Sequence, residues 1–148
     1  MSQVSWSWSL EHVLPSEHGA GHPIIEAVRQ QLADANWSEQ EIFGIRLALE
    51  EALVNAIRHG NRLDRAKQVH VACKLSQRVL RVEITDQGEG FNPNDVPDCT
   101  DPERLELPCG RGIMLMRCYM TRVEYNDTGN LVVMEKERGA HPDGCCCD

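Results

Sequence analysis

Three segments of this sequence carry polar and glycine residues in patterns that a buried core does not need. The first contains Glu51 and Asn55, four residues apart in a stretch with helical periodicity, so both side chains leave one side of a helix. A carboxylate and a carboxamide placed one turn apart can hold a hydrated Mg²⁺ and accept a proton. For these two residues alone, the alternative is an ordinary surface Glu–Asn pair.

The second segment, Asp86-Gln-Gly88-Glu-Gly90-Phe91, directly follows a predicted strand. Gly88 and Gly90 allow positive φ angles and a close approach of the backbone to a ligand. An Asp at the end of a strand can accept a hydrogen bond from a buried amino group, such as that of adenine. The alternative is a simple turn, because Asp-x-Gly is common in turns.

The third segment, Gly110-Arg111-Gly112, opens a predicted helix. Free backbone N–H groups at a helix N-terminus bind phosphate, and Arg111 adds a charge that can pair with a terminal phosphate. A glycine hinge for a mobile loop is the alternative. The segment is neither a Walker loop nor a dinucleotide-binding fingerprint, because the spacing of both motifs is absent.

The elements that position these segments follow from hydrophobic periodicity. Alternation of apolar and polar residues predicts strands over 4–10, 69–75, 79–85, 122–125 and 131–136. Helical spacing predicts helices over 23–34, about 39–59 and 113–119, the second with a capping box at Ser38 and Glu41 and a stop at Gly60. This order predicts an α+β fold, a two-layer α/β sandwich with helices on one face of a mixed, mostly antiparallel sheet.

A long acidic loop separates the second and third segments. Eight acidic residues and one basic residue, Arg104, lie between Glu83 and Leu107, and four of the seven prolines fall within 93–108. A loop of about 20 residues inside a compact domain is typical of a lid or a binding loop. We expect a single domain over 1–137 and a flexible, cysteine-rich tail over 138–148.

Composition limits the classes of function. The 148 residues carry a net charge of −8, which disfavours direct binding to nucleic acid or to an anionic membrane. There is no apolar run of the roughly 20 residues that a membrane span needs and no secretory signal pattern, so we expect a cytoplasmic protein. The seven cysteines lack metal-ligand spacing and are expected to be reduced; Cys145, Cys146 and Cys147 leave the role of the tail open.

Taken in order along the chain, the three segments and the acidic lid resemble the GHKL-type ATP-binding fold, or Bergerat fold, of gyrase, Hsp90, histidine kinases and MutL. The resemblance covers about residues 24–136. Within that fold, the stretch from Leu49 to Gly60 is most similar to the bacterial anti-sigma factors that are serine-protein kinases.

The resemblance implies a role for each motif residue. Asn55 would coordinate Mg²⁺ that bridges the phosphates, Glu51 would be the catalytic base and Asp86 would bind the adenine amino group. Gly88 and Gly90 would shape the base pocket, and Gly110, Arg111 and Gly112 would hold the phosphates of ATP. It also implies a homodimer that phosphorylates a serine of an anti-anti-sigma factor and binds a sigma factor.

Three other functions remain open from the sequence. The first is a nucleotide-binding anti-sigma or partner-binding module without phosphoryl transfer. It is favoured by Asn130 and Leu131 after Gly129, because the family usually carries a Gly-Thr pair there. The presence of Glu51 favours the kinase over this alternative. An ATPase in the gyrase or Hsp90 manner would need further domains and a lysine from outside the fold. A domain that binds no nucleotide is disfavoured by the intact Asn55, Asp86 and glycine motifs.

Overall fold

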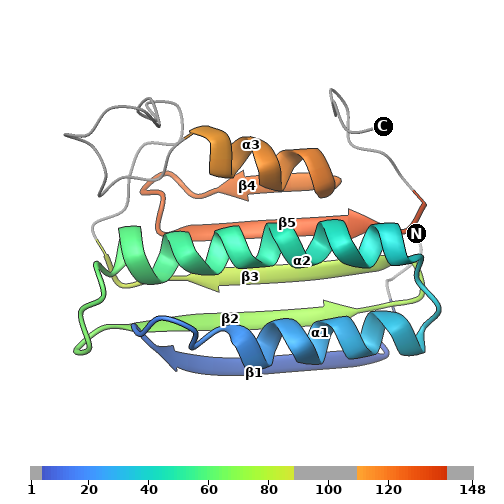
Figure 1. The fold of residues 1–148 in the computed structure, drawn as a ribbon, viewed down its shortest axis with the longest axis horizontal. Coiled ribbons are helices and arrows are strands. Elements are labelled where there is room, and N and C mark those ends of the chain that lie inside the picture. Colours follow the sequence, from blue (N-terminus) through green and yellow to red (C-terminus); the bar gives the residue numbers. More distant parts are fainter. Residues whose placement is uncertain (1–4, 89–109, 140–148) are drawn as a thin grey trace.

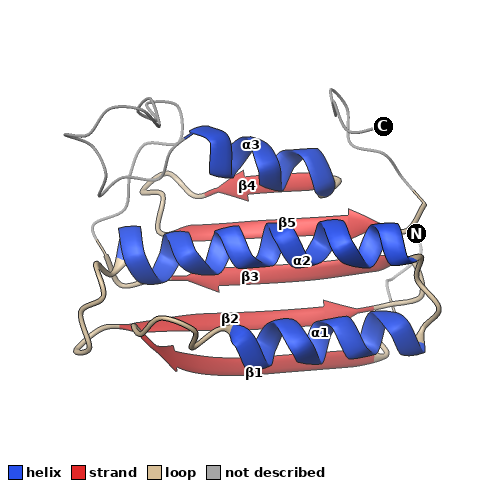
Figure 2. Ribbon diagram, in the orientation of Figure 1, coloured by secondary structure: helices blue, strands red, loops and turns tan. Residues whose placement is uncertain are grey.

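The structure, a computed structural model, describes residues 5–88 and 110–139, which form a layer of helices on one side of a β-sheet (Figure 1). The helical elements are α1 (His22–Asp34), α2 (Glu39–Val54), η1 (Asn55–Gly60) and α3 (Gly110–Tyr119). The strands are β1 (Trp8–Pro15), β2 (Gln68–Leu75), β3 (Val79–Thr85), β4 (Arg122–Tyr125) and β5 (Leu131–Glu137). Figure 2 shows the two layers by secondary structure.

Among the described residues the sheet has five strands in the order β1-β2-β3-β5-β4, and each neighbouring pair is antiparallel. β2 and β3 form a hairpin whose turn is fastened by Ser76: its Oγ accepts from the Val79 N–H at 3.0 Å. β4 and β5 form a second hairpin. The predicted α+β sandwich and both predicted hairpins are therefore confirmed.

The first strand lies further along the chain than the alternation predicted. The prediction placed it over 4–10, whereas β1 runs from Trp8 to Pro15 and pairs along the full length of β2. Leu14 fills the core at the end of this strand. Because β1 is an edge strand, Pro15 can end it without leaving a ladder hydrogen bond unmade.

The core lies between the helices and one face of the sheet. α1 contributes Ile24, Val28 and Leu32, and α2 contributes Ile45 and Leu49, all of them buried as the helical periodicity predicted. The inward residues of the strands complete this core: Val69, Val71, Leu80, Val82, Ile84, Val132 and Met134. Burial of this apolar surface is the main term that holds the two layers together.

The predicted capping box starts α2. The Ser38 Oγ accepts from the Glu41 N–H at 3.1 Å, and the Glu41 Oε1 accepts from the Ser38 N–H at 3.4 Å. The other carboxylate oxygen of Glu41 accepts from the Gly139 N–H at 2.7 Å. Glu41 therefore joins the start of α2 to the chain that leaves β5.

The end of this helix differs from the prediction of one α-helix over about 39–59. The α-helix stops at Val54, and Asn55–Gly60 form the π-helix η1. The Asn61 N–H donates to the Ala56 carbonyl, five residues back, at 2.9 Å. Hydrophobic periodicity over so few residues does not distinguish a π turn from an α turn. Single π-helical turns often occur at functional sites.

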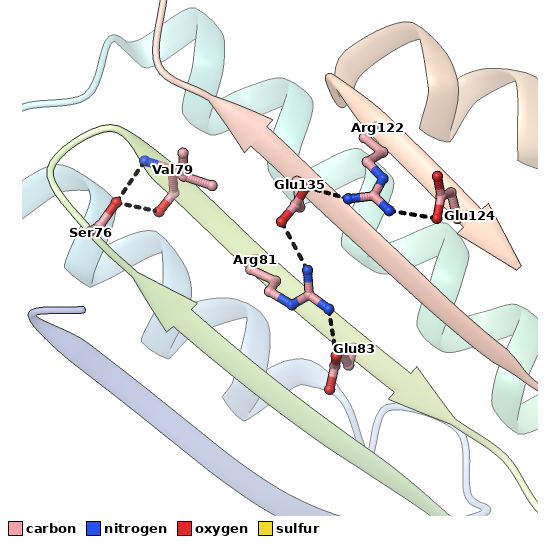
Figure 3. Close-up of polar contacts among 7 residues, drawn as sticks. All are labelled: Ser76, Val79, Arg81, Glu83, Arg122, Glu124 and Glu135. Carbon is pink, nitrogen blue, oxygen red and sulfur yellow. Dashed lines mark hydrogen bonds and ion pairs between the residues drawn. The ribbon is translucent and has the colours of Figure 1, made fainter. Parts of the chain in front are cut away.

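The other face of the sheet is covered with charged side chains. Glu135 on β5 lies between two arginines, accepting from Arg81 Nη1 at 2.9 Å and from Arg122 Nη1 at 3.1 Å (Figure 3). Arg81 also pairs with Glu83 on β3, and Arg122 pairs with Glu124 on β4. The pairs of Arg81 are half-buried and those of Arg122 are more exposed, and ion pairs at a protein surface usually add little stability. Among the described helices, none has the length and apolarity to cross a membrane.

Candidate nucleotide site

The ends of five elements, three strands and two helices, meet at one end of the sheet. Thr85, the last residue of β3, pairs with Leu131 at the start of β5, and Tyr125 at the end of β4 pairs with Val132. η1 ends at this same end of the sheet, and α3 begins there (Figure 1). A pocket opens among these ends, and its polar lining comes from Asn55, Gly60, Asp86, Tyr125, Gly129 and Asn130.

Asn55 is the buried polar residue that the helix contributes to the pocket. Only 9% of it is exposed, and its backbone N–H donates to the Glu51 carbonyl, one helical turn back. Within the described part of the chain, its side-chain nitrogen has no hydrogen bond of good geometry. A buried amide without such a bond is costly unless a ligand or water satisfies it. This side chain is therefore suited to bind a ligand in the pocket.

Tyr125 lines the same pocket and contacts Asn55. Burial raises the pKa of its hydroxyl to about 12, while the contact with Asn55 and the charge of Arg117 act in the opposite direction. The negative charges of Asp86 and Glu51 also act on this hydroxyl. Tyr125 therefore lies within electrostatic reach of both carboxylates that the sequence singled out, one from the helix and one from the strand.

Asp86 lies at the end of β3 and is buried. Its backbone N–H donates to the Asn130 carbonyl at 2.9 Å, and its Oδ1 accepts from the Gly88 N–H at 2.8 Å. Burial raises the pKa of this carboxyl to about 6; the Gly88 N–H and the charge of Lys67 oppose the rise. At neutral pH, Asp86 is therefore an ionised acceptor held in a poorly solvated place.

Two glycines allow the helix end and the strand end to touch. A Cβ added at Gly60 would overlap the Asp86 carboxylate, and a Cβ added at Gly88 would overlap the Gly60 carbonyl oxygen. The sequence singled out Gly88 for close approach to a ligand. In the structure, the neighbour described for Gly88 is the helix end at Gly60.

The structure brings some of the predicted site residues together. Asn55 and Asp86 line one pocket, and Gly88 supports the carboxylate of Asp86. Glu51 is half-buried one turn before Asn55, but it is not among the described residues that line this pocket.

The remaining predicted site residues belong to the start of α3 and to the predicted acidic lid. Gly110, Arg111 and Gly112 form the first turn of α3, whose predicted start was residue 113, and the Arg111 side chain lies outside what the structure describes. Gly90 and residues 89–109 of the predicted acidic lid also lie outside the described residues.

The residues present fit a magnesium ion that is held mainly by phosphates. Among the described residues there is no group of three His, Cys, Asp or Glu side chains that could hold a metal by themselves. Mg²⁺ is usually bound through one or two protein oxygens together with substrate phosphates and water. Asn55 is buried in the pocket, and its side-chain Oδ1 can supply such a ligand, whereas the Nδ2 group that lacks a hydrogen bond is a donor and does not bind a cation.

Sequence reasoning missed Tyr125 and did not foresee the position of Asn130. In the sequence, Tyr125 has no role beyond the last position of a predicted strand, whereas in the structure it lines the pocket. The Asn130 Oδ1 accepts from Asn126 Nδ2 and Thr128 Oγ1, both at 2.8 Å, so its side chain fastens the β4–β5 turn. A polar residue ending a short strand is the signal that could have indicated Tyr125.

A two-layer α+β fold with a buried carboxamide at a helix end and a buried carboxylate at a strand end has the architecture of an ATP-binding domain of the histidine-kinase type. Residues 14–136 match the histidine kinase-like ATPase domain family. The chain belongs to this family, as the resemblance in the sequence indicated.

Relatives within the family include anti-sigma factors and serine-protein kinases. The chain is 28% identical over 135 residues to the anti-sigma F factor of Clostridium botulinum (strain Eklund 17B), covering 88% of this chain and 87% of the relative. It is 28% identical over 107 residues to the serine-protein kinase RsbW of Bacillus licheniformis, covering 68% and 67%.

A solved structure supports the same fold. The crystal structure of the RsbU and RsbW domains of a Mycobacterium tuberculosis protein superimposes with a TM-score of 0.58 at 15% identity. The match covers 92% of this chain but 34% of the other, so this chain spans about a third of that protein. At this identity the comparison establishes the fold alone.

Proposed function

We propose that this protein is an ATP-dependent regulatory serine-protein kinase and anti-sigma factor. It phosphorylates a serine of an anti-anti-sigma partner and sequesters a sigma factor. The observation that carries the proposal is the shared pocket of Asn55 and Asp86, contributed by a helix end and a strand end. The names of the relatives, anti-sigma F factor and serine-protein kinase RsbW, support the same function.

Each site residue has a role in this proposal. Asp86 accepts a hydrogen bond from the adenine amino group, and Gly88 and Gly90 shape the base pocket. Asn55 holds Mg²⁺, which offsets phosphate charge when it is bound. The N-terminus of α3, with Gly110, Arg111 and Gly112, binds the phosphates.

Glu51 supplies the base for phosphoryl transfer. It takes the proton of the attacking serine hydroxyl as the serine oxygen bonds to the γ-phosphorus and the bond to the β-phosphate oxygen breaks, releasing ADP. Positioning and charge neutralisation account for most of the rate in such reactions. The half-buried place of Glu51, within electrostatic reach of Tyr125, is compatible with this role.

The wider setting of the protein belongs to the same proposal. We infer a cytoplasmic homodimer with one domain over 1–137 and a tail over 138–148. It acts on protein partners and not directly on nucleic acid or membrane. The net charge of −8 supports the last point, because nucleic acids and most membrane surfaces are themselves anionic.

A second candidate is a nucleotide-binding anti-sigma module that does not transfer phosphate. Two observations favour it: Glu51 is not among the described pocket-lining residues, and the Asn130 side chain is engaged within its own turn. In this case ATP binding would regulate how the partner is held. Both candidates require that the pocket bind ATP.

Calorimetric titration of the chain with ATP, with and without Mg²⁺, tests the shared requirement. We expect metal-dependent binding. Incubation of the complex with γ-labelled ATP and a candidate anti-anti-sigma partner then separates the two candidates, because only the kinase labels a serine. Absence of binding at millimolar ATP would contradict both.

A further inference from the structure

Asn61 directly follows η1 and is completely buried, with 0% of its surface exposed. Its side chain makes three hydrogen bonds to three separate segments. The Nδ2 group donates to the Oγ of Ser16, the residue after β1, at 2.9 Å. It also donates to the carbonyl of Gln68, the first residue of β2, at 3.0 Å. The Oδ1 atom accepts from the Gln87 N–H at 2.7 Å, after β3.

The chemistry of these partners requires a carboxamide. A backbone N–H can only donate and a backbone carbonyl can only accept, so the oxygen of Asn61 must face Gln87 and its nitrogen must face Gln68. A carboxylate would lack the donors, and an apolar side chain would leave buried polar groups without partners, which is costly.

The bond to Gln87 connects Asn61 to the carboxylate in the pocket. Gln87 follows Asp86 and makes two hydrogen bonds. Its N–H donates to Asn61 Oδ1, and its Oε1 accepts from the Gln68 N–H at 2.6 Å. Asp86 itself is held through its N–H by the Asn130 carbonyl. Asn61 thus supplies the side-chain contact that fixes the residue next to Asp86.

Gly60, the residue before Asn61, makes a second contact between the helix end and the strand end. Gly60 lies against the Asp86 carboxylate, and Asn61 binds Gln87, so two successive residues of the helix end contact two successive residues of the strand end. Because Gln87 is joined directly to Asp86, a displacement of Gln87 would also move the backbone that carries the Asp86 carboxylate.

We propose that Asn61 is a positioning residue that fixes the Asp86 loop and thereby sets the preference of the pocket for adenine over guanine. This inference rests on the proposed function. Adenine carries an amino group where guanine carries a carbonyl oxygen. A fixed carboxylate accepts a hydrogen bond from the adenine amino group and repels the guanine carbonyl oxygen. A carboxylate that can move can avoid this repulsion, so it distinguishes the two bases less well.

The experiment compares wild type, Asn61→Ala and the control Ser16→Ala. Ser16 is equally buried and bonds to Asn61 and to the Lys67 carbonyl, but its removal leaves the Asn61–Gln87 bond in place. Calorimetry with MgATP and MgGTP gives the ratio of the two affinities. We expect Asn61→Ala to lose about 10- to 100-fold of ATP affinity with a smaller change for GTP, while Ser16→Ala keeps the wild-type ratio.

A second measurement does not depend on nucleotide. Hydrogen exchange of the Gln87 amide, followed by NMR on the nucleotide-free chain, should accelerate in Asn61→Ala and not in Ser16→Ala. If Asn61→Ala does not fold, Asn61→Ser takes its place, because it keeps a polar group in the buried site.

Three results would overturn the inference: an unchanged ATP-to-GTP ratio in Asn61→Ala, an equal loss of that ratio in Ser16→Ala, or unchanged exchange at Gln87. A wild-type chain that binds neither nucleotide would instead contradict the proposed function and, with it, the base preference. The exchange rates would then decide by themselves whether Asn61 holds the Asp86 loop.

Discussion

The carboxylate of Asp86 occupies the space that a side chain at Gly60 would fill. One residue ends a strand and the other ends a helix, so this contact determines how closely the two layers approach at the pocket. Gly60 therefore does more than end the helix, which is the role that its sequence position predicted. It gives room to the carboxylate that we propose binds adenine.

Replacing Gly60 by Ala tests this contact. The new Cβ would overlap the carboxylate, so we expect the free energy of unfolding to fall by about 1–3 kcal/mol and ATP affinity to fall with it. Urea unfolding and calorimetry measure the two effects. Gly19→Ala is the control: Gly19 has a φ of +78° and no atom within 4 Å of an added Cβ, so stability should fall while ATP affinity stays unchanged. Equal ATP binding in wild type and Gly60→Ala would contradict the close contact.

ATP binding should weaken as the pH falls through about 6, the raised pKa of Asp86. Protonation turns the carboxylate oxygen that accepts from adenine into a donor. Asp86→Asn keeps an acceptor oxygen that does not titrate, so its affinity should lack this step. Calorimetry of both proteins from pH 5 to pH 8 makes the comparison, and the titration of ATP itself cancels between them. Parallel pH profiles would show that Asp86 does not contact the base.

The same carboxyl should affect stability with the opposite dependence on pH. Its pKa is raised from 3.8 to about 6 in the folded state, so the folded chain binds the proton more tightly than the unfolded chain. The free energy of unfolding should therefore decrease as pH rises from about 4 to about 6. Other acids titrate in this range, so the measured quantity is the difference in urea stability between wild type and Asp86→Asn. A pH-independent difference would contradict the burial of this charge.

The roles of Asn55 and Glu51 separate binding from transfer. Asn55→Ala should abolish Mg²⁺-dependent ATP binding, because it removes the proposed protein ligand of the metal. Glu51→Ala should keep ATP binding and lose transfer to the partner serine, by a factor of about 100 or more. Calorimetry and phosphate labelling report the two properties. Equal nucleotide affinity in Asn55→Ala and wild type would refute the role of Asn55 as a magnesium ligand. Unchanged phosphoryl transfer in Glu51→Ala would refute the role of Glu51 as the catalytic base.

The capping box offers a change that affects stability but not the site. Ser38→Ala removes the acceptor of the Glu41 N–H at the start of α2, and it should lower the free energy of unfolding by about 1 kcal/mol. ATP affinity should stay at the wild-type value, because the pocket lies at the opposite end of the helical segment. A lower affinity in Ser38→Ala would mean that nucleotide binding responds to a general loss of stability and not only to changes in the pocket.

Local patterns predicted most of this fold because each depends on few neighbours. The capping box at Ser38 and the buried positions Ile45 and Leu49 follow from contacts within a helix or against a single sheet face. The position of β1 depends on pairing with β2, which lies more than fifty residues later in the chain. Alternation alone could not fix that register.

The candidate site was predictable where a motif names a residue and not where distant segments meet. Asn55 and Asp86 stand out in the sequence and do line one pocket. Asn61 gains its importance from contacts with other parts of the chain, and a single asparagine after a helix gives no signal of them. Tyr125 is indicated in the sequence only as a polar residue that ends a short strand, and its contacts at the pocket come from other segments. The π turn is missed for the same reason, because it depends on how the helix end meets the strand ends.

The wide turn at the end of the long helix also affects how this sequence should be compared with others. In an α-helix, His59 would lie one turn below Asn55, whereas in η1 the widened turn lets Asn55 and Gly60 line the same pocket. Removing one residue from this turn would rotate everything after it by about 100° around the helix axis and carry Asn61 away from its three partners. An alignment with a relative whose helix is regular throughout therefore needs a one-residue gap within the helix, a place where gaps are normally penalised most.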